Sequence, residues 1–181
     1  MEKIILGIDP GTNIMGYGIV LSKDTKIEII ECGVLSLVKQ KDPYIKLKMI
    51  YQFVTELIDK YHPDELSIES PFYAKNIQSM LKLGRAQGVA IAAALSRELP
   101  IFEYSPRKIK QSVTGNGNAS KEQVAGLLTT MYGVDFSKQP LDVSDAIAVA
   151  VCHGFQNDLS KSQKSCKDWS SFISKNPDRI L

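Results

Sequence analysis

The sequence predicts an α/β fold: a mixed sheet, with an antiparallel meander followed by parallel strands, and helices on both faces of that sheet. Two observations lead to this prediction. Three apolar, β-branched runs with short connections come first, as in a meander. Segments of helical and strand periodicity then alternate, as in a sheet extended by parallel strands. The 181 residues, of which 44% are hydrophobic and 23% charged, suit one compact globular domain.

The meander is expected in the first forty residues. Residues 4–8 form a short apolar strand that ends at the turn signal Asp9-Pro10-Gly11. Strands at 15–21 and 27–38 follow, with residues 23–25 as the hairpin turn between them. These short connections favour antiparallel pairing of consecutive strands.

Helices and strands alternate in the middle of the chain. Apolar residues recur at helical spacing over residues 44–61, and Pro63 ends that helix. A short buried strand is expected at 65–69, a second helix at about 77–97 and a further strand at 101–104. This order predicts crossover helices that connect parallel strands.

Start signals mark the remaining helices. Pro106 suits the first turn of one helix. Ser120, with Gln123 three residues later, is a capping-box arrangement that begins the next. Asp142 opens the final helix, which is rich in Ala and Val and is expected to run through Cys152.

One domain is expected at residues 1–156. From 157 to 181 Ser, Lys, Asn and Asp dominate, which predicts a polar, poorly ordered C-terminal tail. Within it, Trp169, Phe172 and Ile173 can still dock as a short helical turn.

Composition predicts a soluble, cytoplasmic protein. The three cysteines, Cys32, Cys152 and Cys166, form no CxxC pair, so a structural zinc site or a disulfide framework is not expected. The apolar start is interrupted too early for a signal peptide, and the apolar stretch at 88–95 is too short to cross a bilayer. The net charge of +2 alone identifies no partner.

Four carboxylates are the candidate catalytic residues: Asp9, Glu69, Asp142 and Asp145. Each also has a structural explanation taken alone. Asp9 can be a turn residue, Glu69 the solvent-facing member of a strand, and the other two a helix cap and its partner. Together they point elsewhere, because the carboxyl ends of neighbouring strands bind ligands in α/β sheets. Asp142 and Asp145, three residues apart, share one face of a helix that can point at those ends.

Such a cluster requires cations. Two carboxylates about 4 Å apart repel by roughly 4 kcal/mol at an effective dielectric constant of 20. Two Mg²⁺ ions would neutralise four carboxylates, and hard oxygen ligands suit Mg²⁺ or Mn²⁺ better than zinc. Paired metal ions are the arrangement for in-line phosphoryl displacement. The sequence therefore predicts a metal-dependent endonuclease.

Five ordered motifs extend to about His153. They are Ile-Leu-Gly-Ile-Asp-Pro-Gly-Thr at 5–12, Ile-Glu-Ser-Pro-Phe at 68–72, Leu-Lys-Leu-Gly-Arg-Ala-Gln-Gly at 81–88, Val-Thr-Gly-Asn-Gly-Asn-Ala-Ser-Lys at 113–121, and Asp-Val-Ser-Asp-Ala-Ile-Ala-Val-Ala at 142–150. This set resembles the RuvC family of bacterial Holliday-junction resolvases. The resemblance implies a ribonuclease H-like fold, a homodimer, and paired symmetric nicks across a four-way junction in DNA recombination and repair. It also implies the branch-migration partners RuvA and RuvB.

The resemblance assigns further roles. It makes Asp9, Glu69, Asp142 and Asp145 the ligands of two Mg²⁺ ions per subunit, with Mn²⁺ as an alternative. By the same carry-over, Phe72 stacks on a base near the branch point. The nicks would leave 5′-phosphate and 3′-hydroxyl ends.

The segment from 104 to 121 is basic and contains no acidic residue. Arg107 and Lys108 suit contacts with the phosphate backbone, although charge alone favours a solvated surface. Lys110 and Lys121 match family lysines that act near the scissile phosphate. Their expected role is to stabilise negative charge in the transition state.

Small residues cluster in the second helix between 84 and 94. They can form a symmetric dimer contact or pack on the protein's own sheet. Two other functions also remain open. The segment 7–12 resembles the first phosphate loop of actin-like and sugar-kinase-like ATP-binding proteins, but no second such loop is found. A non-catalytic junction-binding protein explains the basic segment but not the four acids.

Overall fold

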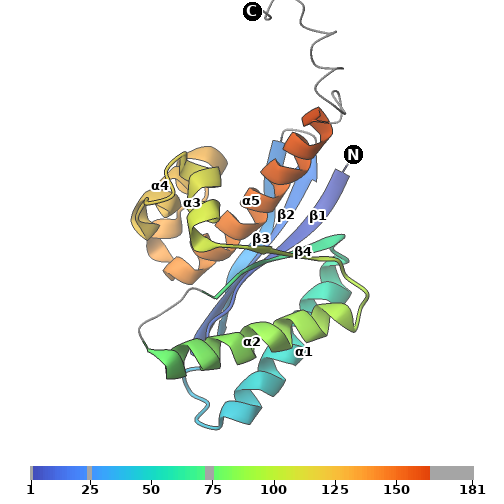
Figure 1. The fold of residues 1–181 in the computed structure, drawn as a ribbon, viewed down its shortest axis with the longest axis vertical. Helices are drawn as coiled ribbons and strands as arrows, with labels where there is room; N and C mark the ends of the chain where they lie inside the picture. The colour runs from blue at the N-terminus through green and yellow to red at the C-terminus, as the bar shows by residue number, and fades with distance from the viewer. Residues whose placement is uncertain (1, 24–25, 72–75, 164–181) are drawn as a thin grey trace, which may run out of the picture.

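A computed structural model describes residues 2–23, 26–71 and 76–163 of the chain. A five-stranded mixed sheet in the order β3-β2-β1-β4-β5 forms its centre. Helices cover both faces of this sheet (Figure 1). The predicted α/β architecture is confirmed.

The strands pair as the sequence predicts. β1 (Glu2–Asp9), β2 (Ile14–Lys23) and β3 (Lys26–Ser36) form an antiparallel meander. β4 (Glu65–Glu69) pairs in parallel with β1, and β5 (Ile101–Tyr104) pairs in parallel with β4. As a result β1 and β4 both end at the same edge of the sheet.

The helices divide between the two faces (Figure 1). The face of α1 and α2 buries one apolar cluster, and the face of the other helices buries a second. The helices are α1 (Pro43–Tyr61), α2 (Ile77–Leu95), α3 (Pro106–Thr114), α4 (Lys121–Tyr132), the 3-10 turn η1 (Phe136–Lys138) and α5 (Leu141–Gln163). None of the helices described is long and apolar enough to cross a bilayer.

Capping residues define the ends of α3 and the start of α4. The predicted capping box at α4 is present: the Gln123 backbone N–H donates to Ser120 Oγ at 3.2 Å, and the Ser120 N–H donates to Gln123 Oε1 at 2.9 Å. Pro106 occupies the first turn of α3, whose N-cap is Ser105. That helix ends at Gly115, whose φ of 74° lies in the left-handed region that glycine adopts without strain.

The last helix differs from the prediction at both ends. It begins at Leu141, so Asp142 lies in its first turn, and it continues past Cys152 to Gln163. The backbone of residues 157–163, the first part of the expected polar tail, continues this helix. Residues 164–181, which include the three apolar residues expected to dock, lie outside the described residues, as does the turn at 24–25.

Helix α5 lies unusually close to the first two strands. A Cβ atom on Gly7 would stand 2.4 Å from the Ala146 carbonyl oxygen, and one on Gly16 would stand 1.9 Å from the Asp142 carbonyl oxygen. Neither distance is possible for a side chain. Only glycine at these positions lets the backbone of α5 rest directly on the sheet.

Replacing Gly16 by alanine is expected to displace α5. Relief of the clash moves backbone, and such overpacking costs about 1–3 kcal/mol of unfolding free energy. Gly126→Ala in α4 is the matched control, because a Cβ there meets nothing within 4 Å. In a helix interior that substitution should be neutral or stabilising by about 0.5–1 kcal/mol. Urea unfolding of both variants measures the difference, and equal stabilities would contradict the close packing.

Candidate active site

The sheet brings two of the predicted acids together. Asp9 is the last residue of β1 and Glu69 the last of β4, and these strands are parallel neighbours. Both carboxylates therefore emerge at the same edge, where α/β proteins bind ligands.

Helix α5 supplies the other two acids. Asp9 pairs across the sheet with Gly16, against which the Asp142 carbonyl oxygen rests. The first turn of α5 is thus held beside the end of β1. Asp142 and Asp145, three residues apart in this turn, are both half-buried there.

The carboxylates affect one another electrostatically. Burial, followed by the negative charges of Glu69 and Asp145, raises the pKa of Asp9 to about 8. Asp142 adds the weakest of these repulsions. Burial and Asp145 similarly raise the pKa of Glu69 to about 7. The shifts therefore reflect lost hydration first and the proximity of like charges second.

Lys121 offsets part of this charge. Its ammonium group donates a hydrogen bond to Asp145 Oδ2. Burial alone would lower the pKa of Lys121, but this bond and the charges of Asp145, Asp9 and Glu69 raise it. Burial raises the pKa of Asp145 despite the opposing effect of Lys121. The lysine is therefore held charged within the cluster.

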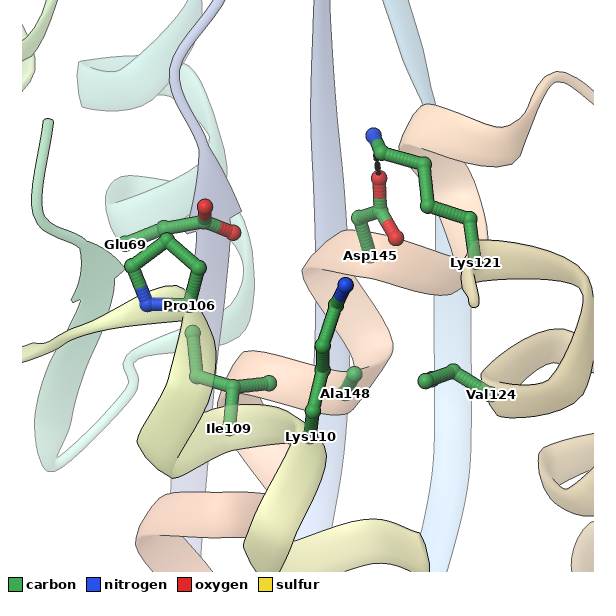
Figure 2. A pocket seen from close by; sticks show the side chains of 8 residues that line it. All are labelled: Glu69, Pro106, Ile109, Lys110, Lys121, Val124, Asp145 and Ala148. Carbon is green, nitrogen blue, oxygen red and sulfur yellow. Dashed lines mark hydrogen bonds and ion pairs between the residues drawn. The ribbon is translucent and has the colours of Figure 1, made fainter. Parts of the chain in front are cut away.

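A pocket of about 110 Å³ opens between these groups. Glu69 and Asp145 line it together with Lys110 and Lys121 (Figure 2). Figure 2 shows the Lys110 ammonium group rising from α3 between Glu69 and the Lys121–Asp145 pair. Apolar residues form the remaining wall, so charged groups of both signs share a small, partly dry space.

The residues present fit divalent cations chemically. Burial and neighbouring negative charges raise the carboxylate pKa values, and carboxylate oxygens are donors that Mg²⁺ prefers. Two lysine charges would leave two of the four carboxylate charges unbalanced. In the part of the chain that the structure describes, no three acidic, His or Cys side chains are yet arranged tightly enough to hold a metal ion.

One residue that holds the site was not identified from sequence. Gln87 of α2 is buried, and its amide nitrogen donates to the Glu69 carbonyl oxygen at 3.4 Å and to Glu103 Oε2 at 2.9 Å. It ties the end of β4 to the helix beneath it. A long amide among alanines and glycines was the available signal, because a buried polar group requires partners.

The basic segment 104–121 lies along one side of the pocket. Lys110 reaches into the pocket, whereas Arg107 and Lys108 are exposed on α3. The Lys108 ammonium group lies 5.2 Å from the centre of the Tyr104 ring. Phe72, the predicted stacking residue, lies outside the described residues.

Helix α2 has one buried and one exposed face, and its small residues lie on both. Buried alanines such as Ala86 and Ala90 pack against the core. The opposite face is exposed and forms one stripe at helical spacing: Ile77, Leu81, Gly84, Gly88, Ala92 and Leu95. A Cβ atom on either of the two glycines would meet nothing within 4 Å.

Comparison with known proteins supports one family. A family model described as crossover junction endodeoxyribonuclease RuvC matches residues 5–153. Crossover junction endodeoxyribonuclease RuvC of Cytophaga hutchinsonii is 55% identical over 181 residues, covering 99% of this chain and 89% of its own length. The RuvC of Bacteroides fragilis is 52% identical over 183 residues, with 99% and 96% covered.

Solved structures agree with this match. RuvC of Thermus thermophilus in complex with a Holliday junction substrate superposes with a TM-score of 0.81 at 28% identity, covering 87% of this chain and 96% of that one. The yeast mitochondrial Holliday junction resolvase shares the fold, with a TM-score of 0.65 at 18% identity, over 87% of this chain and 80% of its own. The predicted ribonuclease H-like fold is confirmed.

The raised carboxylate pKa values predict how stability depends on pH without metal. Asp9 and Glu69 have unshifted values of 3.8 and 4.5 and folded values of about 8 and 7. Between these limits the folded state retains protons that the unfolded chain loses. Stability should therefore fall as the pH rises from about 4.5 to 8.

Asp9→Asn isolates this effect, because every other titrating group is common to both proteins. Melting temperatures are measured in EDTA at pH 5 and at pH 8. The decrease from pH 5 to pH 8 should be larger in the wild type than in the variant. Parallel falls in the two proteins would show that Asp9 titrates normally.

Proposed function

The chain belongs to the crossover junction endodeoxyribonuclease RuvC family, and on that premise we propose that it resolves four-way (Holliday) DNA junctions by paired symmetric nicks. The carboxylate cluster at the ends of β1 and β4, with two lysines facing it, carries the proposal. Its biological setting is DNA recombination and repair. Membership of an endonuclease family favours this function over an ATP-binding protein or a non-catalytic junction-binding protein.

We assign Asp9, Glu69, Asp142 and Asp145 as the ligands of two Mg²⁺ ions, with Mn²⁺ as an alternative. Burial, together with mutual repulsion, raises the pKa values of Asp9 and Glu69, and bound cations would relieve both effects. When bound, the metal ions would neutralise the cluster and polarise the scissile phosphate. Together with the two lysines they would give the site a net positive charge that suits DNA.

The lysines have a direct part in hydrolysis. Water adds to phosphorus, the bond to the 3′ oxygen breaks, and the products are a 3′-hydroxyl and a 5′-phosphate. Negative charge grows on the phosphate oxygens during this step. Lys121, held by Asp145, and Lys110, which enters the same pocket, are placed to stabilise that charge.

Other residues would hold the DNA. Arg107 and Lys108 are exposed beside the pocket and suit phosphate contacts. We also retain Phe72 as a residue that stacks on a base near the branch point, since it follows Glu69 by only three residues. A stacking contact of this kind is worth about 1–3 kcal/mol.

We infer a homodimer that forms through the exposed stripe of α2. The stripe presents Ile77, Leu81 and Leu95, which are 63%, 57% and 61% exposed, around two open glycines. An apolar stripe with room for close approach suits a second copy, and two-fold symmetry suits two cuts. Analytical ultracentrifugation tests this: a mass of 20.0 kDa at micromolar concentration would contradict it.

Partners and location follow from the substrate. We propose RuvA and RuvB, the branch-migration proteins of the resembled system, as functional partners. We propose a cytoplasmic location, because a chromosomal DNA substrate would be found there. The division into a nuclease domain at 1–156 and a separate tail remains part of the proposal.

Asp9→Asn should abolish cleavage and leave junction binding intact or stronger. The change removes one ligand charge without altering the basic segment. A gel-shift and a cleavage assay with Mg²⁺ on a mobile four-way junction, using one preparation, measure both properties. The wild type should cut the junction at symmetric positions and leave linear duplex intact. Parallel loss of binding and cleavage in a folded variant would refute the role of Asp9.

Lys121→Ala should cut slowly even when every junction is bound. A group that acts only in the transition state lowers the maximal rate, here by on the order of 10²-fold or more in single-turnover cleavage. Lys108→Ala is the matched control, because it should weaken binding but recover the wild-type rate at saturation. If Lys121→Ala cleaves at the wild-type rate when the junction is saturated with protein, Lys121 only binds DNA and is not a catalytic group.

A further inference from the structure

A second basic segment lies on the other face of the sheet. The connection from β3 into α1, residues 38–48, contains Lys39, Lys41, Lys46 and Lys48 and a single acid. That acid, Asp42, is occupied as the N-cap of α1, where its side chain accepts the backbone N–H groups at 44 and 45. The segment therefore carries a local excess of positive charge.

This segment is fixed to the loop that follows Asp9. The Lys46 ammonium group donates to the Thr12 carbonyl oxygen at 2.9 Å and to Asn13 Oδ1 at 2.8 Å. The Leu37 backbone N–H donates to the Asn13 carbonyl oxygen at 2.7 Å, and the Leu37 side chain is fully buried. The connection consequently has a defined position beside the catalytic edge.

The lysines next to this anchor are available to a ligand. Lys39, Lys41 and Lys48 are exposed, and none of them forms an ion pair with any residue in the described parts of the chain. Four lysines elsewhere do pair with a carboxylate: Lys3, Lys23, Lys121 and Lys138. Tyr44, 74% exposed, lies among them, an arrangement typical of nucleic-acid surfaces.

Position gives the patch its significance. Figure 1 shows α3 and α4 on one face of the sheet and the start of α1 on the other, at the end of the molecule where β1 stops. DNA with its phosphate at Asp9 would have Lys110 and Lys121 on the first side. The β3–α1 segment would face it on the second side.

We propose that Lys39, Lys41 and Lys48 form a second DNA-binding site, which holds the phosphate backbone of the junction on the side of Asp9 opposite the catalytic lysines. The site rests on the proposed function and extends it. Lys46 is a positioning residue: it fastens this surface to the loop after Asp9. Backbone contacts of this kind add affinity and orientation without reading sequence.

The test is a Lys39→Ala, Lys41→Ala double variant of the full chain. Each lost phosphate contact removes about one unit from the slope of log affinity against log salt, so the slope should fall by about 2 per protomer. Junction affinity should weaken by roughly tenfold at moderate salt. Single-turnover cleavage at saturating protein should keep the wild-type rate.

Two variants control for charge and folding. Lys26→Ala, Lys60→Ala removes the same charge at the opposite end of the sheet and should leave the slope unchanged. Lys39→Arg, Lys41→Arg keeps the charge and should bind as the wild type does. Equal melting temperatures verify the fold of all variants.

Three results would overturn the proposal. They are an unchanged slope and affinity in the alanine variant, a loss of saturated rate with binding intact, or an equal loss of binding in the far-end control. Failure of the wild type to cut would count against the nuclease function alone. The binding comparison would still decide whether this surface contacts DNA.

Discussion

The contact between α5 and the first hairpin underlies the rest of this molecule. The carbonyl oxygens of Ala146 and Asp142 in α5 lie against the strands at Gly7 and Gly16, which have no side chains to obstruct them. The helix backbone can therefore approach the strands more closely than any side chain would allow. Because this contact lies at the end of β1, it carries the first turn of α5, with its two acids, to the edge where Asp9 emerges.

Bringing acids together in this way has an electrostatic cost that the protein offsets only in part. Lys121 is bonded to Asp145, and Lys110 enters the same pocket, yet the pKa values of Asp9 and Glu69 remain raised to about 8 and 7. A site with residual negative charge is prepared for divalent cations. The same packing that stabilises the fold thus creates the electrostatic strain on which the chemistry depends.

The geometry is also consistent with a large substrate at the proposed catalytic edge. Helices lie on both faces of the sheet (Figure 1), so the proposed DNA contacts can come from each face. The exposed stripe of α2 points away from its own core, whereas the buried face of that helix supports Glu69 through Gln87. Site support and the proposed subunit contact therefore use opposite faces of one helix.

Hydrophobic periodicity and turn or capping residues were sufficient to locate most elements, because their effects are local. The meander, the capping box at Ser120 and the start of α3 were predicted in this way. The four acids could be chosen because their strand and helix positions are local as well. Local signals could not find the end of α5 at Gln163, since its polar last turns lack an apolar pattern. Nor could they show which lysine pairs with Asp145, that Gln87 holds Glu69, or that Lys46 joins α1 to the loop after Asp9. These contacts join residues distant in sequence, and only the packing of α1, α2, α4 and α5 around the sheet determines them.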